Sequence, residues 1–247
     1  MLQHKAILFT GGSGLLGREF QKYLPDVNYP SSREFDVTNY HQMADYIENK
    51  NLEMIIHAAA FTSPPKVDRD PLAALSANII GTACVVKLCI NNNLRLIYIS
   101  TDYVFRGDQG HYKEFDPVYP VNRYAWSKLG GECAVRMYDN SLIIRTSFGP
   151  NVFPYEKAFV DQWTSRESVR EIARRIIALL DKEITGIIHV GGERKTVFQY
   201  AKSLDESRDI KPLSIKEVEF KVPVDTSLNC EKYHQIMMGK IFSEEDI

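Results

Sequence analysis

A tyrosine and a lysine four residues apart, Tyr124 and Lys128, follow an apolar run that ends in Ser100-Thr101-Asp102. On a helix, residues four apart share a face, so the phenol and the ammonium would lie together. A free phenol loses its proton near pH ~10, and a neighbouring ammonium lowers that pKa. Such a tyrosine can protonate a carbonyl oxygen while hydride attacks the carbon, and Thr101 can supply a second hydrogen bond. The pattern predicts carbonyl reduction, with Thr101, Tyr124 and Lys128 as the catalytic residues.

The tyrosine–lysine spacing is a weak signal alone, because most such pairs lie on a helix surface without function. It gains weight from Gly11, Gly14 and Gly17, which stand between an expected strand at residues 5–10 and an expected helix ending near Leu24. Glycine permits a tight turn and close approach of a pyrophosphate, and the helix N-terminus offers free N–H groups. The order strand, turn, helix favours a dinucleotide-binding turn over a loop that is merely rich in glycine.

The choice of dinucleotide depends on the residues after an expected second strand at residues 27–29. An acidic residue there would bind the ribose 2′-hydroxyl of NAD, but the chain reads Pro30-Ser31-Ser32-Arg33. Hydroxyls and a guanidinium suit a 2′-phosphate, so NADP(H) is preferred. Glu34 keeps NAD(H) open, and a solvated loop with an ordinary arginine is nearly as good an interpretation.

Apolar runs alternate with amphipathic stretches along most of the chain. Further strands are expected at residues 54–60, 96–99, 142–146 and 187–190, and helices after Thr38 as N-cap and at residues 71–91, 168–180, 196–204 and 232–238. Strands that are apolar throughout, separated by helices, predict an α/β fold with a doubly wound parallel (Rossmann) sheet. We expect residues 1–147 to form the dinucleotide-binding core. Residues 148–247 would add the remaining core elements and a small, trimmed C-terminal substrate lobe.

The bulk composition excludes several other classes of function. The 247 residues carry a net charge of −2, which gives no basic excess for nucleic acid. We find no apolar run of membrane-spanning length, and the first residues leave no room for a signal peptide. The four cysteines and six histidines lack metal-ligand spacing, so we expect no metal, reduced thiols and a cytoplasmic location.

With these motifs in place, the chain resembles the extended short-chain dehydrogenase/reductases, and within them the dTDP-4-dehydrorhamnose reductase group. The resemblance rests on residues 10–17, Asp36-Val37-Thr38, Ala58-Ala59-Ala60, residues 100–105, Tyr124 with Lys128, Arg145-Thr146-Ser147, Asp161-Gln162 and Ser227-Leu228-Asn229. It implies NAD(P)H-dependent reduction of a nucleotide-linked 4-keto-6-deoxysugar. A homodimer is the assembly expected from such relatives.

The resemblance also implies roles for individual residues. Cofactor contacts fall on Gly11, Ser13, Gly14, Leu15, Leu16, Gly17, Ser32, Arg33, Asp36, Val37, Ala58, Ala59, Ala60, Thr62, Tyr124 and Lys128. Substrate contacts fall on Val67, Asp102, Tyr103 and Phe148. Asn78 would support the catalytic residues, whereas His57 is expected only to pack within its strand.

Two features of the sequence bear on the reaction. Asp102 is followed by Tyr103, and a single carboxylate argues for simple reduction over the dehydration that related enzymes perform with paired acids. Only residues 149–160 separate the Arg145 strand from Asp161-Gln162, too few for the substrate-covering helix of relatives. Alternatives therefore stay open: a non-catalytic NAD(P)-binding regulatory protein, or a sugar-nucleotide epimerase. Arg145 could equally bind a diphosphate or serve as a structural partner.

Overall fold

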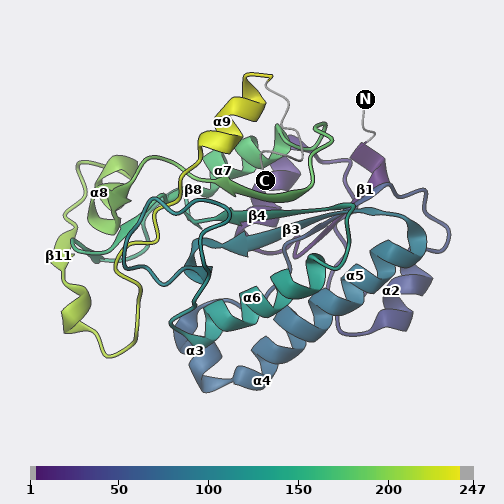
Figure 1. The fold of residues 1–247 in the computed structure, drawn as a ribbon, viewed down its shortest axis with the longest axis horizontal. Coiled ribbons are helices and arrows are strands. Elements are labelled where there is room, and N and C mark those ends of the chain that lie inside the picture. The colour runs from purple at the N-terminus through teal and green to yellow at the C-terminus, as the bar shows by residue number, and fades with distance from the viewer. Residues whose placement is uncertain (1–3, 240–247) are drawn as a thin grey trace. The chain divides into compact units, whose positions relative to one another are not determined.

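The computed structural model describes residues 4–239. A short 3-10 turn, η1 (His4–Ala6), leads into a central sheet with strand order β1-β2-β3-β4-β9 (Figure 1). The strands are β1 (Ile7–Thr10), β2 (Met54–His57), β3 (Arg95–Thr101), β4 (Ser141–Thr146) and β9 (Gly186–Val190). β1 runs parallel to β2, and β2 parallel to β3, with Met54 paired to both Ile7 and Arg95. This parallel sheet is the one that the strand–helix alternation predicted.

The order in which the chain adds strands to the sheet reverses at β1. Asn28, in the expected second strand, only bridges the free edge of β1, where its backbone bonds Phe9 and Ile7 at 2.8 and 2.9 Å. The strand expected at residues 27–29 is therefore reduced to a single bridge. Because one crossover leads to this edge and the next leads to β2 on the other side, a switch point forms beside the glycine turn, where open α/β sheets bind ligands.

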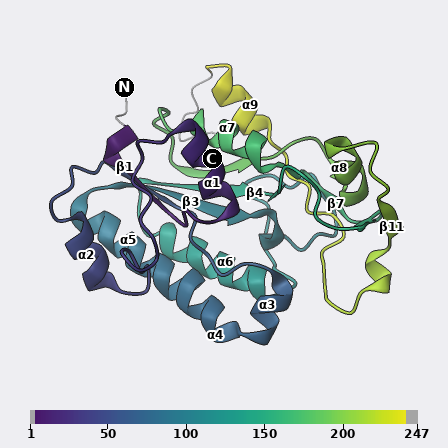
Figure 2. The same cartoon turned by 180° about the vertical axis from the view of Figure 1, so that it is seen from behind.

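The chain divides into two compact units. The first comprises Met1–Ser100, Arg123–Ile144 and Leu180–Gly186, and the second comprises Thr101–Asn122, Arg145–Leu179 and Ile187–Ile247. In the first unit, α5 (Gly81–Asn92) and α6 (Arg123–Val135) cover one face of the strands, and α1 (Leu15–Tyr23) lies on the other (Figures 1 and 2). The expected domain division after residue 147 stays a prediction.

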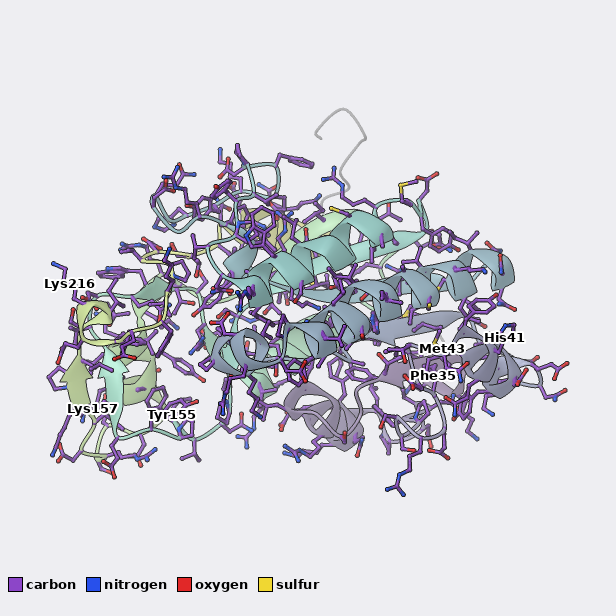
Figure 3. The ribbon with its side chains drawn as sticks, turned by 90° about the horizontal axis from the view of Figure 1, so that it is seen from below. Phe35, His41, Met43, Tyr155, Lys157 and Lys216 are labelled. Carbon is purple, nitrogen blue, oxygen red and sulfur yellow. The ribbon has the colours of Figure 1, made fainter. Side chains whose placement is uncertain are left out.

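Helix α2 (Tyr40–Ile47) begins later than the sequence suggested. Thr38, the expected N-cap, donates its amide and hydroxyl to Asp36 Oδ1, so its side chain is already engaged in a turn. Asn39 caps the helix instead by accepting from the Gln42 N–H. Phe35, which precedes the helix, and Met43 within it are both buried (labelled in Figure 3). The prediction of Thr38 as the cap was therefore wrong by one residue.

The helix expected at residues 71–91 is continuous from Pro71 to Asn92 but not uniform. It comprises α4 (Pro71–Ala74), a π-helical turn η2 (Leu75–Ile80) and α5, and Asp70 caps it by accepting from the Ala73 N–H. By length and composition alone it could cross a membrane, contrary to our expectation from the sequence. The core helix of a soluble protein passes the same test, and 44% of its most apolar window is buried in the protein.

The second unit contains a small lobe around β6 (Lys157–Phe159) and β11 (Lys211–Leu213), which pair in parallel, and α8 (Val197–Leu204). Its core contains Phe153, Ala158, Val197, Tyr200, Ala201 and Ile210. Tyr155, Lys157 and Lys216 mark this lobe in Figure 3. The chain between β5 (Phe148–Gly149) and β6 forms no helix, as its length predicted.

The remaining elements are short or lie close to their predicted positions. They are α3 (Pro64–Arg69), η3 (Asp102–Val104), β7 (Trp163–Thr164), β8 (Glu167–Ser168), α7 (Val169–Ile177), β10 (Lys195–Thr196), η4 (Ile215–Glu217) and α9 (Glu231–Met237). Ser168 and Thr196 cap α7 and α8, because each side chain accepts the backbone N–H three residues on.

Candidate active site

The glycine turn is shaped by backbone-to-backbone contact. Gly11 has a φ of +77°, and a Cβ there would lie 2.8 Å from the Ala59 nitrogen. A Cβ on Gly17 would lie 2.5 Å from the Gly12 Cα and 2.6 Å from two carbonyl oxygens. Gly14 precedes α1 without a side-chain cap, so the first N–H groups of the helix have no side-chain acceptor there. Such a turn is suited to a phosphate.

The other residues expected around this turn differ in accessibility. Ser13 and Gly14 are exposed and Leu15 is half-buried, whereas Leu16 is 4% exposed and packs in the core. Leu16 could therefore offer a cofactor only its backbone. Ala58, Ala59 and Ala60 are half-buried, and Thr62 is exposed.

The loop after the Asn28 bridge is ordered by its own hydrogen bonds. Glu34 accepts from the amide and hydroxyl of Ser31 at 2.9 and 2.8 Å, which lowers the pKa of its carboxyl. Gln42 accepts from the Asp36 N–H and donates to the Arg33 carbonyl. The side chains of Ser32 and Arg33 are exposed. Val37 packs against Gly81, where a Cβ would lie 2.8 Å from a Val37 methyl group.

Lys128 is buried on the inner face of α6, with only 3% of its surface exposed. Its Nζ lies 4.1 Å from the centroid of the Tyr98 ring, and the Tyr98 hydroxyl donates to the Lys128 carbonyl at 3.2 Å. Burial lowers the pKa of Lys128 to about 7, and the charge of Glu132 opposes that shift. Glu132, one turn further on, is buried and accepts a 2.5 Å hydrogen bond from the Ser100 hydroxyl.

Asn78 joins three segments of the first unit from its place in the π-helical turn. Its Oδ1 accepts from the Phe61 N–H at 2.7 Å, and its Nδ2 donates to the Phe61 carbonyl and to the Ser127 hydroxyl. The Ser127 hydroxyl in turn donates to the Tyr124 carbonyl at 2.7 Å. The backbone that carries Tyr124 is therefore fixed to the helix before it.

Thr101 and Asp102, in the second unit, form a buried hydroxyl–carboxylate cluster. Thr101 directly follows Ser100 in β3, donates to Asp102 Oδ1 at 3.2 Å and accepts from the Tyr103 N–H. Asp102 Oδ2 accepts from Thr226 at 2.6 Å and from Thr164 at 3.4 Å. Burial raises the pKa of Asp102, and the hydrogen bond from Thr226, the charge of Arg166 and the hydrogen bonds from Thr101 and Ser147 oppose the shift. This environment makes Asp102 an anchor for the strand end.

The other expected substrate residues of the second unit are more accessible. Tyr103 and Phe148 are half-buried, and the Tyr103 hydroxyl accepts from Gln162 Nε2 at 3.0 Å. Arg145 is 2% exposed, donates to the Glu114 carbonyl and lies 5.0 Å from the Phe105 ring. It is a structural partner at the strand end. In the first unit, the predicted contact Val67 is 1% exposed within α3.

Two arginines of the second unit escaped the sequence analysis. Arg166 donates to the Ser147 hydroxyl at 3.4 Å and interacts with Tyr103. Its position four residues after Gln162, before α7 begins at Val169, was the signal available. Arg194 stacks 3.7 Å above the Trp163 ring and pairs with Asp225 at 2.8 Å, contacts that no spacing in the sequence indicated.

The sequence of this chain is similar to those of several known proteins. The model of the RmlD substrate binding domain family matches residues 5–167. The chain belongs to this family. A dTDP-4-dehydrorhamnose reductase of Aggregatibacter actinomycetemcomitans is 30% identical over 214 residues, covering 83% of this chain and 70% of the relative. The methionine adenosyltransferase 2 subunit beta of Pongo abelii is 25% identical, covering 97% of this chain and 84% of the relative.

Solved structures agree with the family assignment. A hypothetical dTDP-4-dehydrorhamnose reductase from Sulfolobus tokodaii has a TM-score of 0.82 and 32% identity, covering 93% of this chain and 94% of the other. A dTDP-4-dehydrorhamnose reductase from Bacillus anthracis, in complex with NADP, has a TM-score of 0.85 and 26% identity, covering 95% and 93%. The expected Rossmann fold, short-chain dehydrogenase/reductase family and oxidoreductase class are thereby confirmed.

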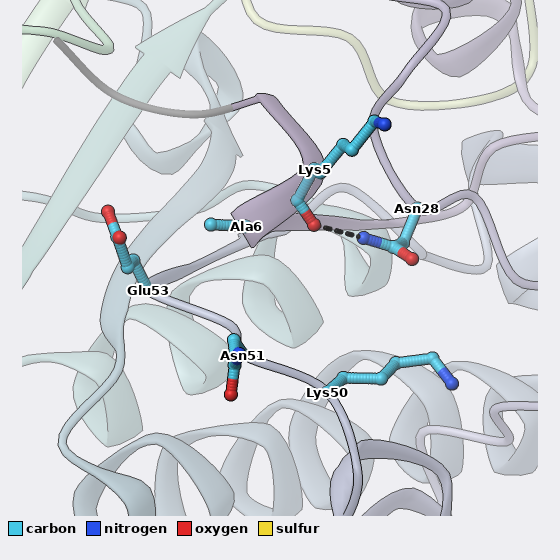
Figure 4. Close-up of a pocket in the computed structure, with 6 residues that line it drawn as sticks. All are labelled: Lys5, Ala6, Asn28, Lys50, Asn51 and Glu53. Carbon is cyan, nitrogen blue, oxygen red and sulfur yellow. Dashed lines mark hydrogen bonds between the residues drawn. The ribbon is translucent and has the colours of Figure 1, made fainter.

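A cavity in this RmlD-family chain lies away from the site. It measures about 500 Å³ and is lined by Lys5, Ala6, Asn28, Lys50, Asn51 and Glu53, with Asn28 Nδ2 bonded to the Lys5 carbonyl at 2.8 Å (Figure 4). Ala6 and Glu53 directly precede β1 and β2, so the cavity lies at the amino ends of these strands. Ligands of open α/β sheets bind at the carboxyl ends. Within residues 4–239, no group of three His, Cys, Asp or Glu residues could hold a metal ion.

The first prediction concerns the glycine turn. Gly17→Ala would drive a methyl group into the Gly11 and Gly12 backbone, so we expect the free energy of unfolding to fall by about 1–3 kcal/mol. A Cβ on Gly14 meets only the Gly11 oxygen, at 3.1 Å, so Gly14→Ala should cost less. Urea denaturation of both variants measures the difference. Equal losses would contradict this account of the turn.

The second prediction concerns the buried ammonium. The folded pKa of Lys128, about 7, lies below the unfolded value of about 10.4, so the unfolded chain binds more protons at this group between these pH values. Its contribution to stability therefore rises with pH across that window. Lys128→Met should be the more stable protein at pH 7, by on the order of a few kcal/mol, and lose that advantage towards pH 10. Lys66→Met, at an exposed position, is the control and should show no such trend.

Proposed function

We propose that this protein catalyses NAD(P)H-dependent reduction of a nucleotide-linked 4-keto-6-deoxysugar, with Tyr124 as proton donor. The observation that carries the proposal is the buried Lys128 ammonium one helical turn after Tyr124, on a helix fixed by the Ser127–Asn78 bonds. Burying a charged lysine costs free energy. A buried lysine one helical turn after a tyrosine is therefore better explained by a chemical role than by packing. The dTDP-4-dehydrorhamnose reductases among the relatives supply the substrate class.

Each residue would have a definite part in this reaction. The chemistry that a bound reduced nicotinamide would supply is a hydride for C4 of the sugar. Tyr124 would give its proton to the oxygen that becomes the hydroxyl, so the carbonyl gains one hydride and one proton. Lys128 would favour the phenolate that remains and lower the cost of that transfer. Thr101, whose hydroxyl donates to Asp102 Oδ1 in the free protein, would turn that hydrogen to the same oxygen when the substrate binds.

NADP(H) is the proposed cofactor. Ser32 and Arg33 are exposed, whereas the nearby Glu34 carboxylate is engaged by Ser31 and so is not free to bind a ribose hydroxyl. A guanidinium and a hydroxyl suit a 2′-phosphate. The Bacillus anthracis reductase in complex with NADP supports the same choice. The pyrophosphate would lie at the glycine turn, with Ala58, Ala59, Ala60 and Thr62 along the path to the nicotinamide.

On the substrate side we propose Tyr103 and Phe148 as the contacts that the sugar nucleotide reaches directly. Both are half-buried, while Asp102 is enclosed by three threonine hydroxyls and would act by holding Thr101 and Tyr103 in place. Val67 is almost completely buried, so it would contribute only through the shape of α3.

A second function is favoured by one specific observation. The methionine adenosyltransferase 2 subunit beta of Pongo abelii aligns with 97% of this chain, a larger share than the 83% matched by the Aggregatibacter reductase. A non-catalytic subunit that binds NADP(H) and regulates a partner enzyme is therefore the alternative. It would keep the glycine turn but would not require turnover.

The test separates these two functions. We expect the purified protein to oxidise NADPH in the presence of a dTDP-4-keto-6-deoxysugar, followed by absorbance of the reduced nicotinamide. Tyr124→Phe should lower kcat by about 10²–10⁴-fold and leave NADPH binding, measured by fluorescence, nearly unchanged. Tyr138→Phe is the matched control, because it removes another partly buried tyrosine hydroxyl, at a position with no proposed role in the reaction. NADPH binding without turnover on several keto-sugars would refute the reductase and favour the regulatory subunit.

The cofactor preference has its own test. Arg33→Ala should weaken NADPH binding by about 10–100-fold, the loss expected for one charge-assisted bond, and leave NADH binding unchanged. Arg136→Ala removes another exposed guanidinium and serves as the control for net charge. Equal effects of Arg33→Ala on both dinucleotides would show that this side chain does not contact the 2′-phosphate.

A further inference from the structure

His57 links two hydroxyl groups from different elements of the first unit. It is the last residue of β2 and is completely buried. Its Nδ1 lies 2.8 Å from the Thr10 hydroxyl at the end of β1, and its Nε2 lies 3.1 Å from the Thr82 hydroxyl in α5. The sequence had suggested only a histidine packed within its strand. The structure places it between the start of the glycine turn and the helix that carries Asn78.

The partners of Thr82 determine which ring nitrogen of His57 carries the proton. The Thr82 hydroxyl donates its single hydrogen to the Asn78 carbonyl at 2.8 Å, so His57 Nε2 must donate to Thr82. A neutral imidazole then leaves Nδ1 as an acceptor, and Thr10 donates to it. The Thr10 oxygen accepts in turn from the Ala59 N–H at 3.1 Å.

The ionisable groups around His57 favour this neutral form. Burial, followed by the nearby charge of Lys128, lowers the pKa of His57 to about 3. The Tyr98 ring from β3 lies 5.7 Å away, and burial raises the pKa of that phenol well above its ordinary value. Neither neighbour offers His57 a negative charge at neutral pH. The ring is therefore a neutral Nε2–H imidazole, and it does not act as an acid or base in this range.

The hydrogen bonds form one directed chain across the first unit. It runs from the Ala59 N–H, which faces Gly11, through Thr10, His57 and Thr82 to Asn78. Asn78 holds Ser127, and Ser127 holds the Tyr124 carbonyl. Every member is buried or half-buried, and each hydroxyl in the chain both accepts and donates. A shift at the glycine turn would therefore be passed to the helix that carries Tyr124.

We propose that His57, held in this single tautomer, is a positioning residue that couples occupancy of the glycine turn to the placement of the Tyr124 helix. The proposal deepens the proposed function and depends on it for the role of Tyr124. Binding of the adenosine and pyrophosphate portion of the cofactor would thereby pre-organise the proton donor before the nicotinamide is in place.

The first test measures coupling without turnover. Adenosine 2′-phosphate 5′-diphosphoribose, which lacks nicotinamide, is added to ¹⁵N-labelled protein, and amide shifts are followed at Gly14 and Ser127. In the wild type we expect both to respond, with His57 showing a protonated Nε2 and an unprotonated Nδ1. Thr82→Val, which removes the central hydroxyl at nearly constant volume, should keep the Gly14 response and abolish that of Ser127. Thr82→Ser should restore it.

The second test uses activity. Thr82→Val should lower kcat at least about tenfold while KM for NADPH changes less than about twofold, because the donor is misplaced but the cofactor site is intact. Thr146→Val is the matched control, since it removes a buried hydroxyl that has no hydrogen-bond partner in the described part of the chain.

The outcomes distinguish this inference from the proposed function. A protonated Nδ1, or a Ser127 response that persists in Thr82→Val, would overturn the coupling even if the enzyme is an active reductase. Coupling that is intact in a protein without turnover would uphold the role of His57 and overturn the reductase. Absence of any Gly14 response would overturn both.

Discussion

The buried ammonium of Lys128 is the constraint to which the rest of the first unit conforms. Removing such a charge from water costs several kcal/mol unless other groups replace the lost hydration. The Tyr98 ring 4.1 Å away and the buried carboxylate of Glu132 one turn on offset part of that cost, and burial still lowers the pKa of Lys128 to about 7. Tyr98 in β3 and Ser100, which bonds Glu132, must then stay in register with α6. The surroundings of one buried lysine thus fix how a helix packs on the sheet.

Much of this architecture was readable from the sequence, because the signals were local. The glycine turn needs particular residues at particular spacing, and apolar runs identify buried strands wherever they occur. The prediction of a second strand at residues 27–29 was wrong in extent, because this segment pairs with the free edge of β1 only through the Asn28 bridge. Asn39 caps α2 in place of Thr38, because the Thr38 amide and hydroxyl already bond the Asp36 carboxylate. The residue preferences at helix N-caps do not account for such a competing hydrogen bond.

The residues that the sequence left unexplained depend on contacts far along the chain. His57 is 25 residues from Thr82, and Arg194 is 31 residues from Asp225. Nothing in the immediate neighbourhood of such a residue reveals its partner, so a histidine in a strand or an arginine after a glycine pair looks ordinary. Asp161 is a further case: it matches the family, but it engages the Ser214 hydroxyl and the Ile215 N–H and so fastens the small lobe.

The π-helical turn at Leu75–Ile80 sets how the side chains before it are rotated about the helix axis relative to those after it. An α-helix advances about 100° per residue, so the one residue accommodated by a π turn rotates everything before it relative to everything after it. Asn78 within the turn can face Phe61 and Ser127 while the Thr82 side of α5 still faces β2. Deleting a single residue here would leave a longer run of regular α-helix with a more regular series of backbone hydrogen bonds. It would also turn α4 and α3 to a new direction. The chain therefore cannot have both a regular helix and the present orientation of α3 and α4.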